Sequence, residues 1–287
     1  MSIWFTEELH PYYRKGIRIK KILADEQTQF QHLQIVETEF FGKAMILDGI
    51  IQLTERDNIG YHEMIVHVPM LAVGKPKRVL IVGGGDGGSL QQVLRYSSVE
   101  QAPVCELDQR VVDLSREHFA SFGDPWTDPR ATLLVRDAFG FLEENPGQFD
   151  VIISDTTDPI GMAERLFSDE FYKLMVRALI PGGAASTQCE QPFFDTALIK
   201  TIYQSAKVLS KNPAYYYANI PTYPGEGIGF MYVSDTPWEN GLKIPPPSGV
   251  NNYINPEIYK AAFALPPCKA DLLPLVLFIS DLLYLIL

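Results

Sequence analysis

The sequence predicts an α/β protein in which a small β-strand domain precedes a larger domain built on a parallel sheet. Residues 1–60 contain short apolar or alternating runs that glycines and charged turns interrupt, without a sustained helical period. From Lys75 onward, apolar β-branched runs alternate with helix-like segments, which is the pattern of βαβ units. We therefore expect a β-strand domain over residues 1–68 and an α/β domain over residues 69–287.

The remaining elements follow in chain order. Residues 61–74 have an apolar spacing that is compatible with a helix bridging the two domains. Residues 169–179 carry apolar side chains at helical spacing, with Ser168 as the expected N-cap and Pro181-Gly182-Gly183 as the expected stop. Four buried strands are expected between these helices, at residues 78–84, 101–108, 131–138 and 149–155.

The composition argues against several classes of partner. The formal net charge is −11 at pH 7 and 46% of residues are hydrophobic. An acidic chain repels phosphate backbones and anionic lipid, so neither a nucleic acid nor a membrane is expected as a partner. The apolar segment 271–287 is shorter than the ~20 residues that span a bilayer, and we expect it to be buried or covered by another subunit, with a contact to a membrane as the alternative.

The cysteines and the N-terminal residues indicate a cytoplasmic protein. The three cysteines, Cys105, Cys189 and Cys268, share no metal-ligand or redox spacing, which suits reduced thiols. The first sixteen residues carry charges where a signal peptide needs an apolar run.

A glycine-rich loop, "GGGDGGSL" from Gly83 to Leu90, follows the first strand of the larger domain. Glycines let backbone N–H groups approach a ligand closely. Asp86 within the loop would repel the pyrophosphate of a dinucleotide, and it favours a ligand with a cationic tail, such as the amine and sulfonium of an S-adenosyl compound. The alternative is a tight turn with a solvated Asp86.

The next two strands also end in polar residues. Glu106 is placed to accept hydrogen bonds from both hydroxyls of a ribose. Asp137 is placed to accept one from the exocyclic amine of adenine, with the backbone of Ala138 at the edge of the ring. Asp108 is better explained as a helix cap. Each residue taken singly is explained equally well as an ordinary turn residue. Because ligands bind beyond the carboxyl ends of parallel strands, the residues together favour one nucleoside site.

Acidic and aromatic residues gather at the expected reacting end of this site. Asp155 and Asp158 follow the fourth strand in "DTTDPIG", although Asp, Thr and Pro are also ordinary turn residues. Carboxylates can hold ammonium groups and aromatic faces can hold methylenes and cations, so the set suits a flexible alkyl diamine. His62 and His67 lack partners at metal-ligand spacing, so no metal is expected. The further candidates are Tyr61, His62, Gln188, Glu190 and Tyr223.

Together these motifs resemble the spermidine synthase family of polyamine aminopropyltransferases. The resemblance covers about residues 1–268 and includes "LDGIIQLTERD", "YHEM", "VLIVGGGDGG", "ELD", "RDA", "DTTDPIG", "IPTYP" and "NPEIYKAAFALP". It implies a Rossmann-like methyltransferase-type sheet with a small N-terminal β domain, and a homodimer or homotetramer. It also implies transfer of the aminopropyl group of decarboxylated S-adenosylmethionine, a co-substrate rather than a cofactor, to putrescine, giving spermidine and methylthioadenosine.

The resemblance also implies roles for individual residues. The nucleoside would be held by Gln52, Asp86, Glu106, Asp137 and Ala138. Asp86 and Asp155 would bind the aminopropyl amine, and Asp155 is the expected catalytic base. The diamine would be held by Tyr61, Asp158, Glu190 and Tyr223, with His62 and Gln188 nearby.

Four features depart from the family pattern. Gln91-Gln92 stands where Arg-Glu is common, Asn58 where an acid is common and Glu226 where a small residue is usual, and the tail from Pro267 lacks the expected charged helix. None of these removes a proposed catalytic group, but they leave amine length and assembly open. Two alternative functions are a polyamine N-methyltransferase that uses intact S-adenosylmethionine and a non-catalytic polyamine-binding scaffold.

Overall fold

The computed structural model describes residues 3–250 and 252–266. The apolar segment 271–287, for which we predicted a buried or subunit-covered position, lies outside the described residues.

The N-terminal residues form a five-stranded antiparallel sheet in which each strand pairs with the next along the chain. Asp48 and Gly49 join the last two strands with φ of 49° and 81°, which is the backbone that a two-residue hairpin turn requires. This confirms the predicted β-strand region. The strands are β1 (Ile3–His10), β2 (Tyr13–Gln27), β3 (His32–Thr38), β4 (Lys43–Leu47) and β5 (Ile50–Thr54).

Helix α1 (Asn58–Val73) connects this sheet to the rest of the chain and confirms the predicted bridging helix. All but two of its residues are buried, so it has no polar face, which explains why its helical period is weak in the sequence. The domain boundary that we expected after residue 68 falls inside this helix, and the division into two domains remains a proposal.

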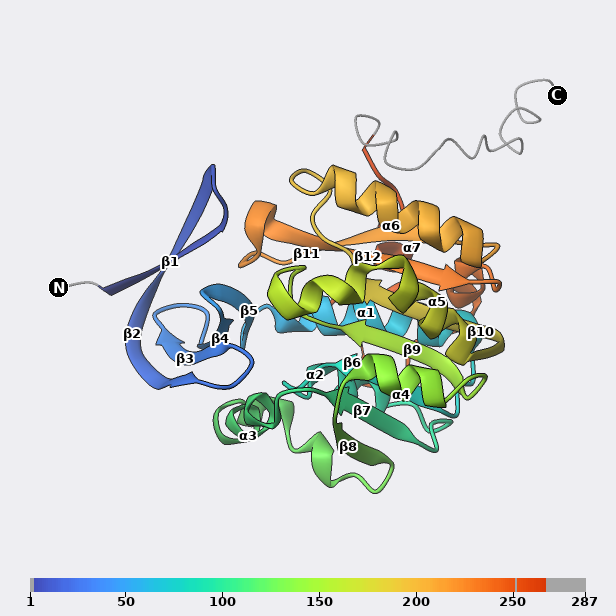
Figure 1. Cartoon of the computed structure of the whole chain (residues 1–287), viewed down its shortest axis with the longest axis horizontal. Coiled ribbons are helices and arrows are strands. Elements are labelled where there is room, and N and C mark those ends of the chain that lie inside the picture. Colours follow the sequence, from blue (N-terminus) through green and yellow to red (C-terminus); the bar gives the residue numbers. More distant parts are fainter. Residues whose placement is uncertain (1–2, 251, 267–287) are drawn as a thin grey trace.

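The larger sheet has seven strands in the order β11-β12-β10-β9-β6-β7-β8. The five strands from β10 through β9, β6 and β7 to β8 are parallel, as predicted. In contrast, β12 runs antiparallel to β10, and β11 runs antiparallel to β12. Figure 1 shows the small sheet at one side of this larger one. The strands are β6 (Val79–Gly83), β7 (Ala102–Glu106), β8 (Ala131–Val135), β9 (Phe149–Asp155), β10 (Leu179–Gln188), β11 (Ala214–Asn219) and β12 (Gly227–Ser234).

Helices cover both faces of the larger sheet. Successive residues of β6 point to opposite faces, so Val79 and Ile81 join one core, with α1 and α2, while Leu80 and Val82 join the other, with α4, α5 and α6. The α/β class with a small N-terminal β sheet is therefore confirmed. The remaining helices are α2 (Gly88–Val93), α3 (Gln109–His118), α4 (Ala138–Glu144), α5 (Asp169–Ala178), α6 (Thr196–Leu209) and α7 (Pro256–Ala261).

The predicted helix over residues 169–179 is correct at its start and wrong at its end. The Ser168 side chain accepts the backbone N–H of Phe171 and caps α5, as predicted. The helix ends at Ala178 rather than at the Pro-Gly-Gly sequence, because Leu179 already pairs with Phe149 of β9. Pro181-Gly182-Gly183 lies within β10, at a shift in the strand register between Leu179 and Ala184.

Candidate active site

A cavity of about 260 Å³ lies beyond the carboxyl ends of β6, β7, β9 and β10, with the small sheet contributing to its wall. This is the edge of an α/β sheet at which ligands bind. All the candidate residues named from the sequence line this one cavity: Gln52, Tyr61, His62, Asp86, Glu106, Asp137, Ala138, Asp155, Asp158, Gln188, Glu190 and Tyr223.

The glycine loop after β6 lies directly against the end of β9. Gly84 donates its N–H to the carbonyl of Asp155 at 2.8 Å. A Cβ on Gly83 would lie 2.1 Å from that same carbonyl oxygen, and its φ is 73°, so only glycine fits here. This close approach brings Asp86, within the loop, beside Asp155, at the end of β9.

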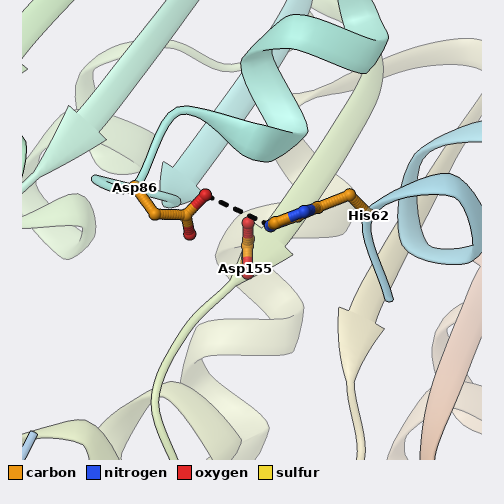
Figure 2. Close-up of side chains that lie close together, drawn as sticks. All are labelled: His62, Asp86 and Asp155. Carbon is orange, nitrogen blue, oxygen red and sulfur yellow. Dashed lines mark ion pairs between the residues drawn. The ribbon is translucent and has the colours of Figure 1, made fainter. Parts of the chain in front are cut away.

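His62, Asp86 and Asp155 point toward one another across the junction of α1, the glycine loop and β9, as Figure 2 shows. One ligand atom from each lies within 4.8 Å of the others. His62 Nε2 lies 3.2 Å from Asp86 Oδ1. The Gly88 N–H donates to Asp86 Oδ1 at 2.6 Å, and the Ser89 hydroxyl donates to Asp155 Oδ2 at 2.6 Å. Both carboxylates are therefore held in place.

The other ring nitrogen of His62 faces Asn58, the residue at which this chain departs from the family pattern. Asn58 Nδ2 donates to the carbonyls of Thr54 at 2.8 Å and Glu55 at 3.0 Å, so its Oδ1 is the atom that faces His62 Nδ1 at 3.3 Å. An amide oxygen can only accept, so Nδ1 donates, and Nε2 donates to a carboxylate. The geometry makes His62 an imidazolium. Burial, the largest single influence, opposes protonation, but the charge of Asp86, its hydrogen bond to the ring and the charge of Asp155 together outweigh it and raise the pKa of His62.

The pKa values of the two neighbouring acids, Asp86 and Asp155, are shifted in opposite directions. Burial, followed by the charge of Asp86, raises the pKa of Asp155 to about 6. Hydrogen bonds from Ser89 and Tyr61 and the charge of His62 offset part of this rise. The pKa of Asp86 is lowered because contacts with His62 and with the Gly88 N–H outweigh its own burial. Asp155 is therefore the carboxylate better able to take up a proton near neutral pH.

Glu106 lies at the end of β7, beside the glycine loop. Its carboxylate accepts the backbone N–H of Gly85 at 3.2 Å and that of Asp108 at 2.9 Å. Burial outweighs these hydrogen bonds and raises the pKa of Glu106 to about 7. Asp108 caps α3 by accepting the Arg110 N–H, which confirms that prediction.

Asp137 and Ala138 lie at the start of α4. Asp137 caps the helix by accepting the N–H of Phe139 at 3.0 Å, and Ala138 is the first helical residue. The second carboxylate oxygen of Asp137 lies 3.4 Å from the Arg165 guanidinium, which itself lies 4.1 Å from the centre of the Phe139 ring.

A second group of acids occupies another part of the cavity. The amide of Gln52 lies 3.4 Å from Asp158 Oδ2, and the Tyr223 hydroxyl donates to the carbonyl of Gln52. Burial raises the pKa of Asp158 to about 6. Burial, then the charge of Asp158, raises the pKa of Glu190 well above its usual value, and Gln188 donates to Glu190 at 3.2 Å.

Other residues of the cavity were not identified from the sequence. His10 at the end of β1, Gln31 in the turn before β3, and Asp195 before α6 all line it. No local pattern marks them, because they reach the cavity through the packing of the small sheet and of the loop after β10.

Glu63, which the "YHEM" motif also contains, accepts the backbone N–H groups of Tyr253 and Ile254 at 2.9 and 2.8 Å.

Comparison with known proteins identifies the family. Residues 3–55 match the model of the spermidine synthase tetramerisation domain, and residues 58–242 match that of the spermine/spermidine synthase domain. The chain is 40% identical over 274 residues to a polyamine aminopropyltransferase of Thermoanaerobacter pseudethanolicus, covering 95% of this chain and 99% of that one. It is 38% identical over 277 residues to a spermidine synthase of Dictyostelium discoideum, covering 95% and 98%.

Solved structures give the same result. A spermidine synthase in complex with the transition-state analogue AdoDATO superposes with a TM-score of 0.90 at 31% identity, covering 94% of both chains. The spermidine synthase of Thermotoga maritima superposes with a TM-score of 0.88, also at 31% identity and 94% coverage of both. These matches, which span both sheets and the cavity between them, establish that the chain belongs to the spermidine synthase family of aminopropyltransferases.

Proposed function

We propose that this chain transfers the aminopropyl group of decarboxylated S-adenosylmethionine to putrescine, giving spermidine and methylthioadenosine. The observation that carries the proposal is the presence of two groups of acids in one cavity. Asp86 and Asp155 lie beside the glycine loop, and Asp158 and Glu190 lie elsewhere along the cavity wall. A sulfonium nucleoside with an amine tail and an alkyl diamine are both cationic, so this arrangement suits both.

The donor would lie along the glycine loop. Glu106 would accept the ribose hydroxyls, and Asp137 with the backbone of Ala138 would receive the adenine. Asp86 and Asp155 would hold the ammonium group of the aminopropyl tail. Gln52 completes the expected nucleoside set, although its contact with Asp158 favours a position nearer the acceptor amine.

The acceptor amine would lie among the second group of acids and the aromatic side chains. Tyr61 and Tyr223 have ring centroids 6.0 Å apart and would pack against the methylene groups. Asp158 and Glu190 would hold ammonium groups, with Gln188 beside Glu190. His62, which we expected near the diamine, lies instead against Asp86.

The chemistry is an in-line displacement at carbon. A nitrogen of the diamine attacks the methylene group next to the sulfonium, the carbon–sulfur bond breaks, and methylthioadenosine leaves as a neutral molecule. The electron pair of the broken bond stays on sulfur, so the leaving group needs no acid. The attacking nitrogen loses one proton, and Asp155 is the group that takes it.

The difficulty is the basicity of the amine. An alkylamine with a lysine-like pKa near ~10.4 is almost entirely protonated at neutral pH, and an ordinary carboxylate with a pKa near ~4 is a weak base for it. The pKa of about 6 for Asp155 narrows this gap. Alignment of the two substrates in one cavity lowers the barrier further.

The proposal includes a cytoplasmic location and assembly as a homodimer or homotetramer, with no nucleic-acid or membrane partner. Cys105 and Cys189 are free and buried, which suits a reducing compartment, and the match of residues 3–55 to a tetramerisation domain supports assembly. Among the described residues, no helix is long and apolar enough to cross a bilayer.

Mass spectrometry of the products tests the proposal. The protein is incubated with putrescine, cadaverine or spermidine, with either decarboxylated or intact S-adenosylmethionine as donor. We expect methylthioadenosine and an aminopropylated putrescine with the decarboxylated donor. A methylated amine formed from the intact donor would instead support an N-methyltransferase, and the absence of any product would support a binding scaffold.

A further inference from the structure

His10 and Asp195 form a pair in the acid-lined part of the cavity. His10 ends β1 in the small sheet, and Asp195 immediately precedes α6 in the larger domain. Both line the cavity together with Asp158 and Glu190. The His10 ring stacks on Phe194, with centroids 4.5 Å apart, so its position beside Asp195 is defined by packing.

The polar atoms of this pair lack hydrogen bonds. His10 Nε2 and Asp195 Oδ2 lie 3.8 Å apart, beyond the ~3.2 Å limit of a hydrogen bond of this kind. Each is buried and has no hydrogen-bond partner among the described residues. The same holds for Oε1 of Gln188, a side chain that is 5% exposed and lines the same cavity.

Buried polar groups in proteins are almost always hydrogen-bonded, and leaving one unpaired is costly. Only five buried side-chain atoms lack a partner in the described chain, and these three line the cavity, whereas the other two, in Arg78 and Arg95, do not. Two of the three, on Gln188 and Asp195, accept hydrogen bonds. The site therefore suits a ligand that donates hydrogen bonds.

The charges around Asp195 specify the kind of donor. Burial raises the pKa of Asp195, and the neighbouring His10 opposes part of this rise. Glu190 lies close enough for the charge of Asp195 to raise its pKa, after burial and Asp158. The charges of these three neighbouring carboxylates, Asp158, Glu190 and Asp195, act on one another and favour a cation. An ammonium group supplies both the charge and three N–H donors.

We propose that Asp195 binds the ammonium group of the acceptor amine that lies farthest from the reacting nitrogen, and that His10 forms the wall that limits the length of that amine. The inference rests on the proposed function and adds a specificity element to it. Because His10 comes from the small sheet, that sheet takes part in choosing the acceptor.

Comparing a diamine with a monoamine tests the role of Asp195. 1-Aminobutane has the reacting nitrogen of putrescine but no far ammonium group. We expect Asp195→Asn to lower the ratio of kcat/KM for putrescine to that for 1-aminobutane at least about tenfold, mainly through a higher KM for putrescine. The Asp195 side chain makes no capping hydrogen bond to α6, so asparagine leaves the helix start intact. Asp113→Asn, on the surface of α3, removes the same charge away from the cavity and should leave the ratio unchanged.

A series of diamines tests the role of His10. His10→Ala removes the imidazole ring and leaves room for a longer acceptor amine. The value of kcat/KM for 1,5-diaminopentane should therefore rise at least about threefold relative to that for putrescine. An unchanged ratio would overturn the assignment of His10. If Asp195→Asn lowers the rates with putrescine and 1-aminobutane equally, or changes neither, the assignment of Asp195 is wrong. The results that would overturn the His10 and Asp195 assignments are all measured relative to an active wild-type protein. Failure of the proposed function is a different result, in which the wild-type protein forms no methylthioadenosine with any amine.

Discussion

His62 and Asn58 are one helical turn apart in α1, and the amide oxygen of Asn58 faces Nδ1 of His62 at 3.3 Å. Because the Asn58 amide nitrogen is occupied by two backbone carbonyls, this contact orients the ring and leaves Nε2 to face Asp86. His62 thus carries a positive charge between two acids, and it neutralises one of them while leaving Asp155 available as a base.

The pH dependence of the reaction should reflect the titration of Asp155, together with that of Asp158, whose pKa is also raised to about 6. Asp155 accepts a proton only when it is ionised, and burial followed by the charge of Asp86 raises its pKa to about 6. We therefore expect kcat/KM for putrescine to fall as the pH decreases through about 6, measured at saturating donor from about pH 4 to pH 8. A decline centred near ~4, the range of an ordinary carboxyl group, would contradict this.

Replacement of His62 should move that decline. The charge of His62 lowers the pKa of Asp155, so His62→Gln removes a stabilising cation from beside the carboxylate. The decline should then occur at higher pH than in the wild type. A decline that stays in place or moves to lower pH would show that His62 does not act on Asp155 through its charge.

Gly88 at the start of α2 is required for the position of His62. A Cβ at this residue would lie 2.1 Å from Cε1 of the His62 ring. Gly88→Ala should displace the ring from Asp86 and lower kcat/KM at least about tenfold, since small displacements in active sites cost up to ~100-fold. Gly140→Ala in α4 is the control, because its Cβ comes no closer than 3.4 Å to a neighbouring atom, the terminal nitrogen of Arg136. If the two variants have equal activity, the packing argument is wrong.

Removal of metal ions should leave the activity unchanged. His62, Asp86 and Asp155 bring three ligand atoms within 4.8 Å, a spacing that could also suit a metal ion. However, a doubly protonated imidazole has no lone pair to offer a metal. Turnover should therefore be the same before and after dialysis against EDTA. A loss that a divalent cation restores would assign the cluster to a metal instead.

Features decided by local sequence were predictable in this fold. Ser168 was identified as the cap of α5 because a side-chain acceptor before a helical run has a local signature. The end of α5 was not, because Leu179 leaves the helix to pair with β9, and such pairing overrides a local stop signal.

The same distinction applies to the site. The carboxyl ends of parallel strands meet at one edge, so Asp86, Glu106 and Asp155 could be expected together before any coordinates were known. His10 and Asp195 could not, since nothing near them in the sequence indicates that β1 and the start of α6 meet. The protonation state of His62 could not be predicted from the sequence either, because it depends on the orientation of the Asn58 amide.

The proposed role of Asp155 as the base distinguishes it from Asp158, which is proposed to bind the amine. Both are carboxyl groups whose pKa burial raises to about 6, so asparagine at either position removes a similar group. Asp158→Asn should act mainly by raising the KM for putrescine, and an unchanged KM would argue against its role.

The most direct test is the turnover of Asp155→Asn, measured as methylthioadenosine released with both substrates saturating. If Asp155 takes the proton of the attacking amine, kcat falls at least about a hundredfold, the low end of the loss when a general base is removed. A variant that turns over at nearly the wild-type rate would contradict the account.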